Sequence, residues 1–260
     1  MDGLLILSVL PVIYLCKYIY DKDTHPEPFK KLRKMFLFGF LSIIPIIILE
    51  TLLSKFFSYN DSTLSFINLF INIFIVVAIS EEGFKWLVTY YVGIKDKECD
   101  EIYDSIVYAV FASLGFACIE NVLYVINGGF NTAIMRAIFT IPGHACFGVL
   151  MGYFIAKSKL NKNSTSLNLF LSFVIPALFH TIYDTLLFKQ EVWSLIVFLV
   201  FDLAMVIYCF LIVKKLSKLQ SNYAANVSKN QNITYNINFC PKCGQNIQNC
   251  NYCPKCGFKK

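Results

Sequence analysis

The residues best able to do chemistry are Glu81, Glu82 and Lys85, which lie together in an apolar run from Leu64 to Val92. Each ionised group at the centre of a bilayer costs about 2.5–3.5 kcal/mol on insertion scales, so such a cluster needs a reason. Glu81 and Lys85 are four residues apart, so they share a helix face and can form an ion pair. Glu82 projects about 100° away from Glu81 and is free to face another partner. The stretch is therefore either a structural ion pair or the acid–base centre of an enzyme.

Polar residues also interrupt the three apolar segments that follow. Glu120 lies in the first of them, Arg136 and His144 lie in the second, and His180 and Asp184 lie in the third. His180 and Asp184 are four residues apart, so the carboxylate can orient the imidazole or bind a metal beside it. A single buried ion pair is often only a structural contact between helices. Because polar groups arrive from four segments at similar depths, we expect them to share one cavity.

The composition is that of a membrane protein. Of the 260 residues, 57% are hydrophobic and only 15% are charged, which is more apolar surface than a soluble domain of this size needs. In a soluble protein the net charge of +6 would suggest binding to nucleic acid. Here the basic residues lie mostly in loops, so they are better explained as the residues that set the orientation of the protein in the membrane. We therefore predict an all-α polytopic membrane protein and expect no nucleic-acid partner.

The apolar segments predict about seven transmembrane helices. Each is roughly long enough to cross a hydrocarbon core of about 30 Å. They are Leu4–Tyr20, Met35–Phe57, Leu64–Val92, Tyr103–Ile126, Ala133–Ala156, Leu167–Phe188 and Val192–Val213.

The distribution of lysine and arginine predicts how these helices are oriented. The 21–34, 95–101, 157–162 and 214–218 loops are rich in basic residues and lie on one side, whereas the loops on the other side carry few. By the positive-inside rule the protein lies in the cell membrane with its N-terminus outside and its C-terminus in the cytoplasm.

The C-terminal part has a different composition. We divide the chain into a transmembrane domain (1–215), a flexible polar linker (216–239) and a small terminal domain (240–260). Two CxxC pairs in the last segment, each followed by glycine, have the spacing of a structural zinc ribbon. The predicted zinc ligands are Cys240, Cys243, Cys253 and Cys256. We favour the interpretation that this segment is a small zinc-stabilised domain that docks a cytoplasmic partner.

The membrane motifs resemble those of the PrsW family of intramembrane proteases, from Asp21 to about Asp184. An EExxK motif matches Glu81-Glu82-Gly-Phe-Lys85, an FxxxE motif matches residues 116–120, and an HxxxD motif matches residues 180–184. A single histidine after a basic residue matches His144. The resemblance implies hydrolysis of a peptide bond in a membrane-anchored protein, with an anti-sigma factor as the type of substrate that relatives cut. It also implies the catalytic residues Glu81 and Glu82, supported by Glu120, His144, His180 and Asp184.

The chemistry of these side chains suits amide hydrolysis. A carboxylate in an apolar cavity can take a proton from water and return it, and we assign this role to Glu81, with Lys85 or Glu82 tuning it. His144 and His180 are candidates to stabilise the oxyanion or donate a proton. A metal-dependent version, with His144, His180, Asp184 and Glu120 as ligands, stays open, although the HExxH signature is absent. We favour the metal-free mechanism.

Three other functions stay open at this point. One is processing of prenylated (CAAX) proteins or of bacteriocins, including an immunity role, although Glu120 stands where the prenyl-processing enzymes carry a histidine. Another is a non-enzymatic membrane scaffold that keeps the polar cluster for assembly. The third is a transporter, since membrane carboxylates also relay protons, but the chain shows no clear internal repeat.

Overall fold

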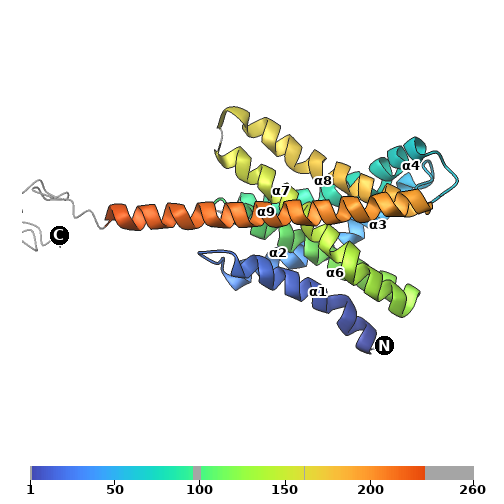
Figure 1. Cartoon of the computed structure of the whole chain (residues 1–260), viewed down its shortest axis with the longest axis horizontal. Coiled ribbons are helices and arrows are strands. Elements are labelled where there is room, and N and C mark those ends of the chain that lie inside the picture. The colour runs from blue at the N-terminus through green and yellow to red at the C-terminus, as the bar shows by residue number, and fades with distance from the viewer. Residues whose placement is uncertain (1, 96–100, 161, 232–260) are drawn as a thin grey trace, which may run out of the picture. The chain divides into compact units, whose positions relative to one another are not determined.

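Helices and the loops between them make up the residues that the computed structural model describes, which are 2–95, 101–160 and 162–231 (Figure 1). No strand occurs among these residues, so the predicted all-α class is confirmed for them. The α-helices are α1 (Asp2–Asp21), α2 (Phe29–Leu41), α3 (Ile43–Leu53), α4 (Phe66–Ile73), α5 (Ile79–Val88), α6 (Asp104–Met135), α7 (Ile141–Leu160), α8 (Thr165–Phe188) and α9 (Val192–Gln231). Short π-helical segments are η1 (Phe74–Ala78), η2 (Thr89–Ile94) and η3 (Arg136–Thr140), and η4 (Lys162–Ser164) is a 3-10 turn.

Five stretches of the described residues are long and apolar enough to cross a membrane. They are Phe29–Leu53, Phe66–Ile94, Asp104–Leu160, Thr165–Phe188 and Val192–Ser221. The predicted number of seven spans is not confirmed, and the predicted orientation of the termini stays a prediction. One reason for the lower number is that the two predicted segments Tyr103–Ile126 and Ala133–Ala156 lie in a single helical stretch of 57 residues.

This long stretch is a hairpin rather than one helix. Gly129 has a φ of 70°, a left-handed conformation that glycine adopts without steric cost, and it breaks the helical path near the end of α6. Beyond it the chain runs back along α6. A Cβ built at Gly148 would lie 2.9 Å from the Cα of Val110, and one built at Gly152 would lie 2.5 Å from the Cα of Ile106. Later residues of α7 therefore meet earlier residues of α6, as in an antiparallel pair.

Helix α6 forms the centre of the packed region. Every residue from Asp104 to Cys118 is buried, and the helix packs against α1, α2 and α7. Small residues at these contacts let the helix backbones approach closely, which is the usual way that helices associate in membranes. The second half of α6, which carries Glu120, is thereby held next to the start of α7, which carries His144.

Two π-helical segments come directly before residues of the predicted site. Segment η1 ends at Ala78, three residues before Glu81, and η3 ends at Thr140, four residues before His144. A π-helical turn holds one extra residue, so it rotates the side chains that follow it relative to a continuous α-helix. Pro142, in the first turn of α7, lacks the N–H that a regular helix would use there.

The chain divides into two compact units, Met1–Gln220 and Ser221–Lys260. Helix α9 continues to Gln231, into the range expected to be linker, and the domain boundaries stay predictions. The predicted zinc ligands of the C-terminal ribbon, Cys240, Cys243, Cys253 and Cys256, lie outside the described residues.

The close contact between α6 and α7 predicts that Gly152→Ala destabilises the protein. The new Cβ would lie 2.5 Å from both the Cα of Ile106 and the carbonyl oxygen of Ser105, which are backbone atoms that cannot rotate away. Overpacking of this kind typically costs about 1–3 kcal/mol, so we expect a lower thermal midpoint for the purified protein in detergent.

The matched control is Gly3→Ala, because a Cβ at Gly3 meets no atom within 4 Å. Equal midpoints for Gly152→Ala, the control and the wild type would contradict the close packing of α7 on α6.

Candidate active site

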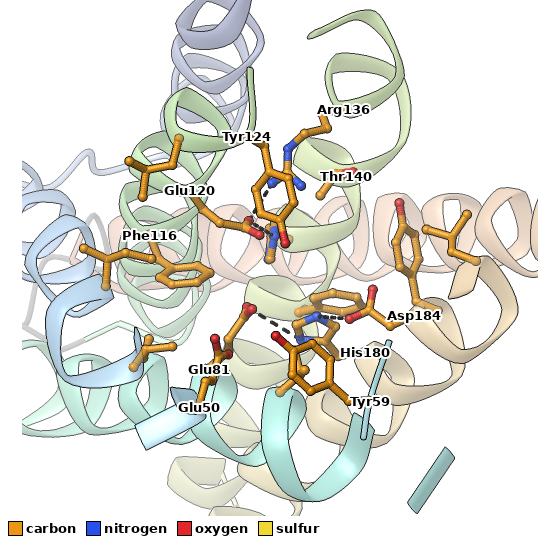
Figure 2. A pocket seen from close by; sticks show the side chains of 18 of the residues that line it. Glu50, Tyr59, Glu81, Phe116, Glu120, Tyr124, Arg136, Thr140, His180 and Asp184 are labelled. Atoms are coloured by element: carbon orange, nitrogen blue, oxygen red, sulfur yellow. Dashed lines mark hydrogen bonds and ion pairs between the residues drawn. The ribbon is translucent and has the colours of Figure 1, made fainter. Parts of the chain in front are cut away.

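Residues from seven helical elements and from the loop after α3 surround a cavity of about 340 Å³ in the membrane-embedded region (Figure 2). Apolar side chains form part of its wall, and ionisable or hydroxyl-bearing side chains form the rest. The polar members that this section uses are Glu50, Tyr59, Glu81, Glu120, Arg136, His144, His180 and Asp184. Figure 2 shows Glu120, Tyr124 and Arg136 on one side of the cavity, Glu50, Glu81 and Tyr59 on the other, and His180 with Asp184 between them.

The ammonium group of Lys85 lies behind this cavity and contacts two of its lining residues, Glu81 and His144, and also Glu82. Its Nζ is 2.9 Å from Oε2 of Glu81, 2.8 Å from Oε1 of Glu82 and 3.2 Å from Nδ1 of His144. The side chain is completely buried, and the ring of Phe116 lies against the charge at 4.2 Å. Lys85 therefore has an acceptor for each of its three N–H bonds and a π-face beside them.

The two adjacent glutamates lie in different surroundings. Glu81 lines the cavity, whereas Glu82 is fully buried and does not line it. One oxygen of Glu82 contacts both Lys85 and, at 3.0 Å, Nδ1 of His180. Glu82 thus does face another partner, as its position on the helix predicts, and it also binds the lysine. Of the two glutamates, Glu81 is the one that a water molecule in the cavity can reach.

His180 is held between carboxylates on both sides. Its Nδ1 lies 3.0 Å from Glu82 and 3.9 Å from Glu81, and its Nε2 lies 3.3 Å from Oδ2 of Asp184. The ring of Phe147 stacks on the imidazole with centroids 4.7 Å apart. Asp184 therefore orients His180 as the HxxxD spacing predicts, and the stacked ring fixes the plane of the imidazole.

A second network runs through His144 on the opposite side of Lys85. An ammonium nitrogen only donates, so Nδ1 of His144 accepts from Lys85, and the ring proton is on Nε2. This Nε2–H donates to Oε2 of Glu120 at 2.9 Å, and the same oxygen accepts from Arg136 at 2.7 Å. Arg136 also donates to Asn121, whose amide donates to the backbone oxygen of Ser8 on α1. Both nitrogens of His144 are therefore in use.

The site has few residues that fit a metal ion without rearrangement. Among the described residues, one buried group with ligand atoms within 4.8 Å of one another is Glu81, Glu82 and His144. Carboxylate and imidazole are ligands that zinc accepts. However, the ammonium of Lys85 contacts all three of these side chains, so it takes the place that a cation would need. The set that the metal-dependent alternative would use, His144, His180, Asp184 and Glu120, does not form such a group among the described residues.

The structure brings the seven predicted site residues together. Five of them line the cavity, and Glu82 and Lys85 lie directly behind it. Their individual catalytic roles stay predictions. The sequence marks Arg136 as a polar residue at depth and as the basic residue before His144, and the structure makes it the ion-pair partner of Glu120.

Two further polar residues of the cavity, Glu50 and Tyr59, belong to no motif of the sequence. Glu50 is an acid in the otherwise apolar helix α3, which by itself indicates a functional position in a membrane protein. Tyr59 lies in the loop after α3, and Figure 2 shows its hydroxyl pointing toward Glu81 and His180. Burial raises the pKa of the Tyr59 phenol, and the negative charge of Glu81 raises it further, so the phenol stays protonated.

Comparison with known proteins agrees with the geometry of the site. The family model described as "PrsW family intramembrane metalloprotease" matches residues 27–213. Protease PrsW of Oceanobacillus iheyensis is 40% identical over 187 residues, which are 72% of this chain and 84% of that protein. Protease PrsW of Clostridioides difficile is 38% identical over 76% of this chain and 84% of that protein. No solved structure matches the chain. Because the family model covers most of the chain and the relatives align over most of their length, the chain belongs to the PrsW family of intramembrane proteases.

Proposed function

We propose that the protein is an endopeptidase that hydrolyses a peptide bond of a membrane-anchored protein with a water molecule activated by Glu81. The observation that carries this proposal is the position of Glu81 on the cavity wall, ion-paired to the buried Lys85 and 3.9 Å from the imidazole of His180. The general base Glu81, its charge partner Lys85 and the imidazole of His180 thus lie close together in a space from which most water is excluded.

Glu81 acts as the general base. Its ion pair with Lys85 keeps the carboxylate ionised in an apolar setting, where an unpaired charge would be too costly. A water molecule between Glu81 and the scissile carbonyl loses a proton to the carboxylate as its oxygen attacks the carbonyl carbon. A positioned general base typically accelerates such a step by about 10²–10⁴-fold.

We assign His180 the role of stabilising the negative charge that develops on the carbonyl oxygen. It lines the cavity, and Asp184 and Glu82 hold both of its nitrogens, so its orientation is fixed before the substrate arrives. His144 has a different role, because its Nδ1 accepts from Lys85 and its ring is neutral. Both nitrogens of His180 instead face carboxylates, which only accept, so its ring carries two N–H groups and a positive charge. We assign His144 to positioning Lys85, and Arg136 to neutralising Glu120.

The mechanism we propose needs no catalytic metal, although the matching family model is described as a metalloprotease. The support is the ammonium of Lys85, which contacts Glu81, Glu82 and His144 together. A metal ion bound by these three side chains would have to displace the lysine, because two cations sharing the same ligands in a buried site repel each other strongly.

The substrate we propose is a single-span membrane protein, and an anti-sigma factor is the type that the family resemblance implies. A cavity of about 340 Å³ has room for a few residues of an unwound peptide rather than for a folded domain. The substrate therefore has to present an unfolded stretch at the level of Glu81.

The central prediction is that Glu81→Gln and His180→Ala each lower cleavage of a reconstituted single-span substrate by at least about 100-fold. Glutamine keeps the shape of Glu81 but cannot take a proton, and alanine removes the imidazole beside the reacting carbonyl. The measurement is the rate of product formation in proteoliposomes, with the amount of inserted enzyme determined in parallel.

Glu191→Gln is the matched control, since Glu191 is about half exposed and pairs with Lys189 away from the cavity. Full cleavage by both cavity variants would rule out the proposed mechanism. If the wild type cuts no substrate but Glu81→Gln loses a bound partner protein, the protein is a scaffold instead.

A further prediction is that removal of metal ions leaves cleavage largely intact, within about 2-fold of the untreated enzyme, because Lys85 supplies the buried positive charge. The test is dialysis against a strong zinc chelator, followed by the cleavage assay. The predicted ribbon could bind zinc independently, so the same treatment is applied to a variant with Cys240, Cys243, Cys253 and Cys256 changed to serine. Loss of activity in that variant after chelation, with recovery on adding zinc, would show that the reaction needs a metal.

A further inference from the structure

Helix α3 turns a regular face toward the cavity of the candidate active site. The four residues of α3 that line it are Ile43, Ile46, Ile47 and Glu50. This is the i, i+3, i+4, i+7 spacing of a single helix face. Three isoleucines form the apolar wall, and the one carboxyl group at the end of the stripe faces the same space as Glu81 (Figure 2).

One oxygen of the Glu50 carboxyl group lacks the partners that an ionised oxygen requires. Its Oε1 is buried and has no hydrogen-bond partner within the described part of the chain. An ionised oxygen in that position would lose its hydration without compensation, whereas the neutral acid avoids this cost. Glu50 is therefore protonated when the reaction begins.

Glu81, in the same cavity, has the charged partner that Glu50 lacks within the described residues. Its Oε2 receives the ammonium of Lys85 at 2.9 Å, which stabilises the ionised carboxylate. Two carboxyl groups in one cavity with opposite protonation are the arrangement that acid–base hydrolysis uses, since one accepts a proton while the other donates. None of the motifs of the sequence supplies this second acid.

We propose that Glu50 is the general acid of the reaction, which gives its proton to the nitrogen of the leaving amine; this rests on the proposed peptidase function. The attacking water gives one proton to Glu81, and its oxygen forms a bond to the carbonyl carbon. The carbon–nitrogen bond then breaks, and the nitrogen takes the proton of Glu50. The products are a carboxylic acid and an amine, with Glu81 protonated and Glu50 ionised.

The cycle closes when the proton on Glu81 passes to Glu50, directly or through a water in the cavity. This transfer restores the ion pair of Glu81 with Lys85 and the neutral state of Glu50. No cofactor or oxidant takes part, and one water is consumed for each peptide bond.

The test uses Glu50→Gln and two substrates that differ only at the scissile linkage, which is an amide in one and a thioester in the other. An amide nitrogen cannot leave without a proton, whereas a thiol with a pKa of about 8.5 leaves as the thiolate. We expect Glu50→Gln to lower the rate on the amide by at least about 100-fold. On the thioester we expect a rate within about 3-fold of the wild type, because the thiolate leaves without a proton and Glu81 still activates the water.

Two controls separate this inference from the proposed function. Glu81→Gln should impair both linkages, since both need an activated water, and Glu191→Gln should impair neither. If the wild type hydrolyses neither substrate, the peptidase function itself fails. If the wild type is active and Glu50→Gln cuts the amide at the wild-type rate, or loses both linkages equally, Glu50 is not the general acid.

Discussion

The buried ammonium of Lys85 is the constraint on which the rest of this structure depends. A positive charge without access to water must be surrounded by acceptors, and removing one partner of such a buried pair typically costs about 3–5 kcal/mol. Glu81, Glu82 and His144 provide those acceptors from two different helices. The lysine thereby fixes the distance between α5 and α7, and it determines which nitrogen of His144 carries the proton.

Around Lys85, the charged side chains form groups in which positive and negative charges offset one another. Glu120 accepts from His144 and from Arg136, so a second cation offsets the second cavity carboxylate on the opposite side (Figure 2). His180 contacts Glu82 and is oriented by Asp184. Almost every ionisable group of the cavity is thus compensated locally. Glu50 is the exception, and an acid without compensation is the one able to hold a proton for the reaction.

Contacts within a helix could be predicted from the sequence. Glu81 with Lys85 and His180 with Asp184 are pairs four residues apart, and both are observed. The period of an α-helix brings such residues onto one face whatever the surrounding fold is. The motifs also indicated that Glu120 belongs with them. The number of spans was less predictable, because the segments 103–126 and 133–156 lie in one long stretch in which Gly129 turns the chain back on itself.

Apolar length and helical period are local properties, so the membrane class, the helical structure, the family and the seven motif residues of the site could be predicted without a structure. How residues from different helices pair became visible only in the fold. It placed Lys85 against His144, 59 positions away. It also turned one face of α3 inward and so added Glu50 to the cavity. Such contacts depend on the close approach of helix backbones and on the turns between them, and no spacing along the chain specifies these.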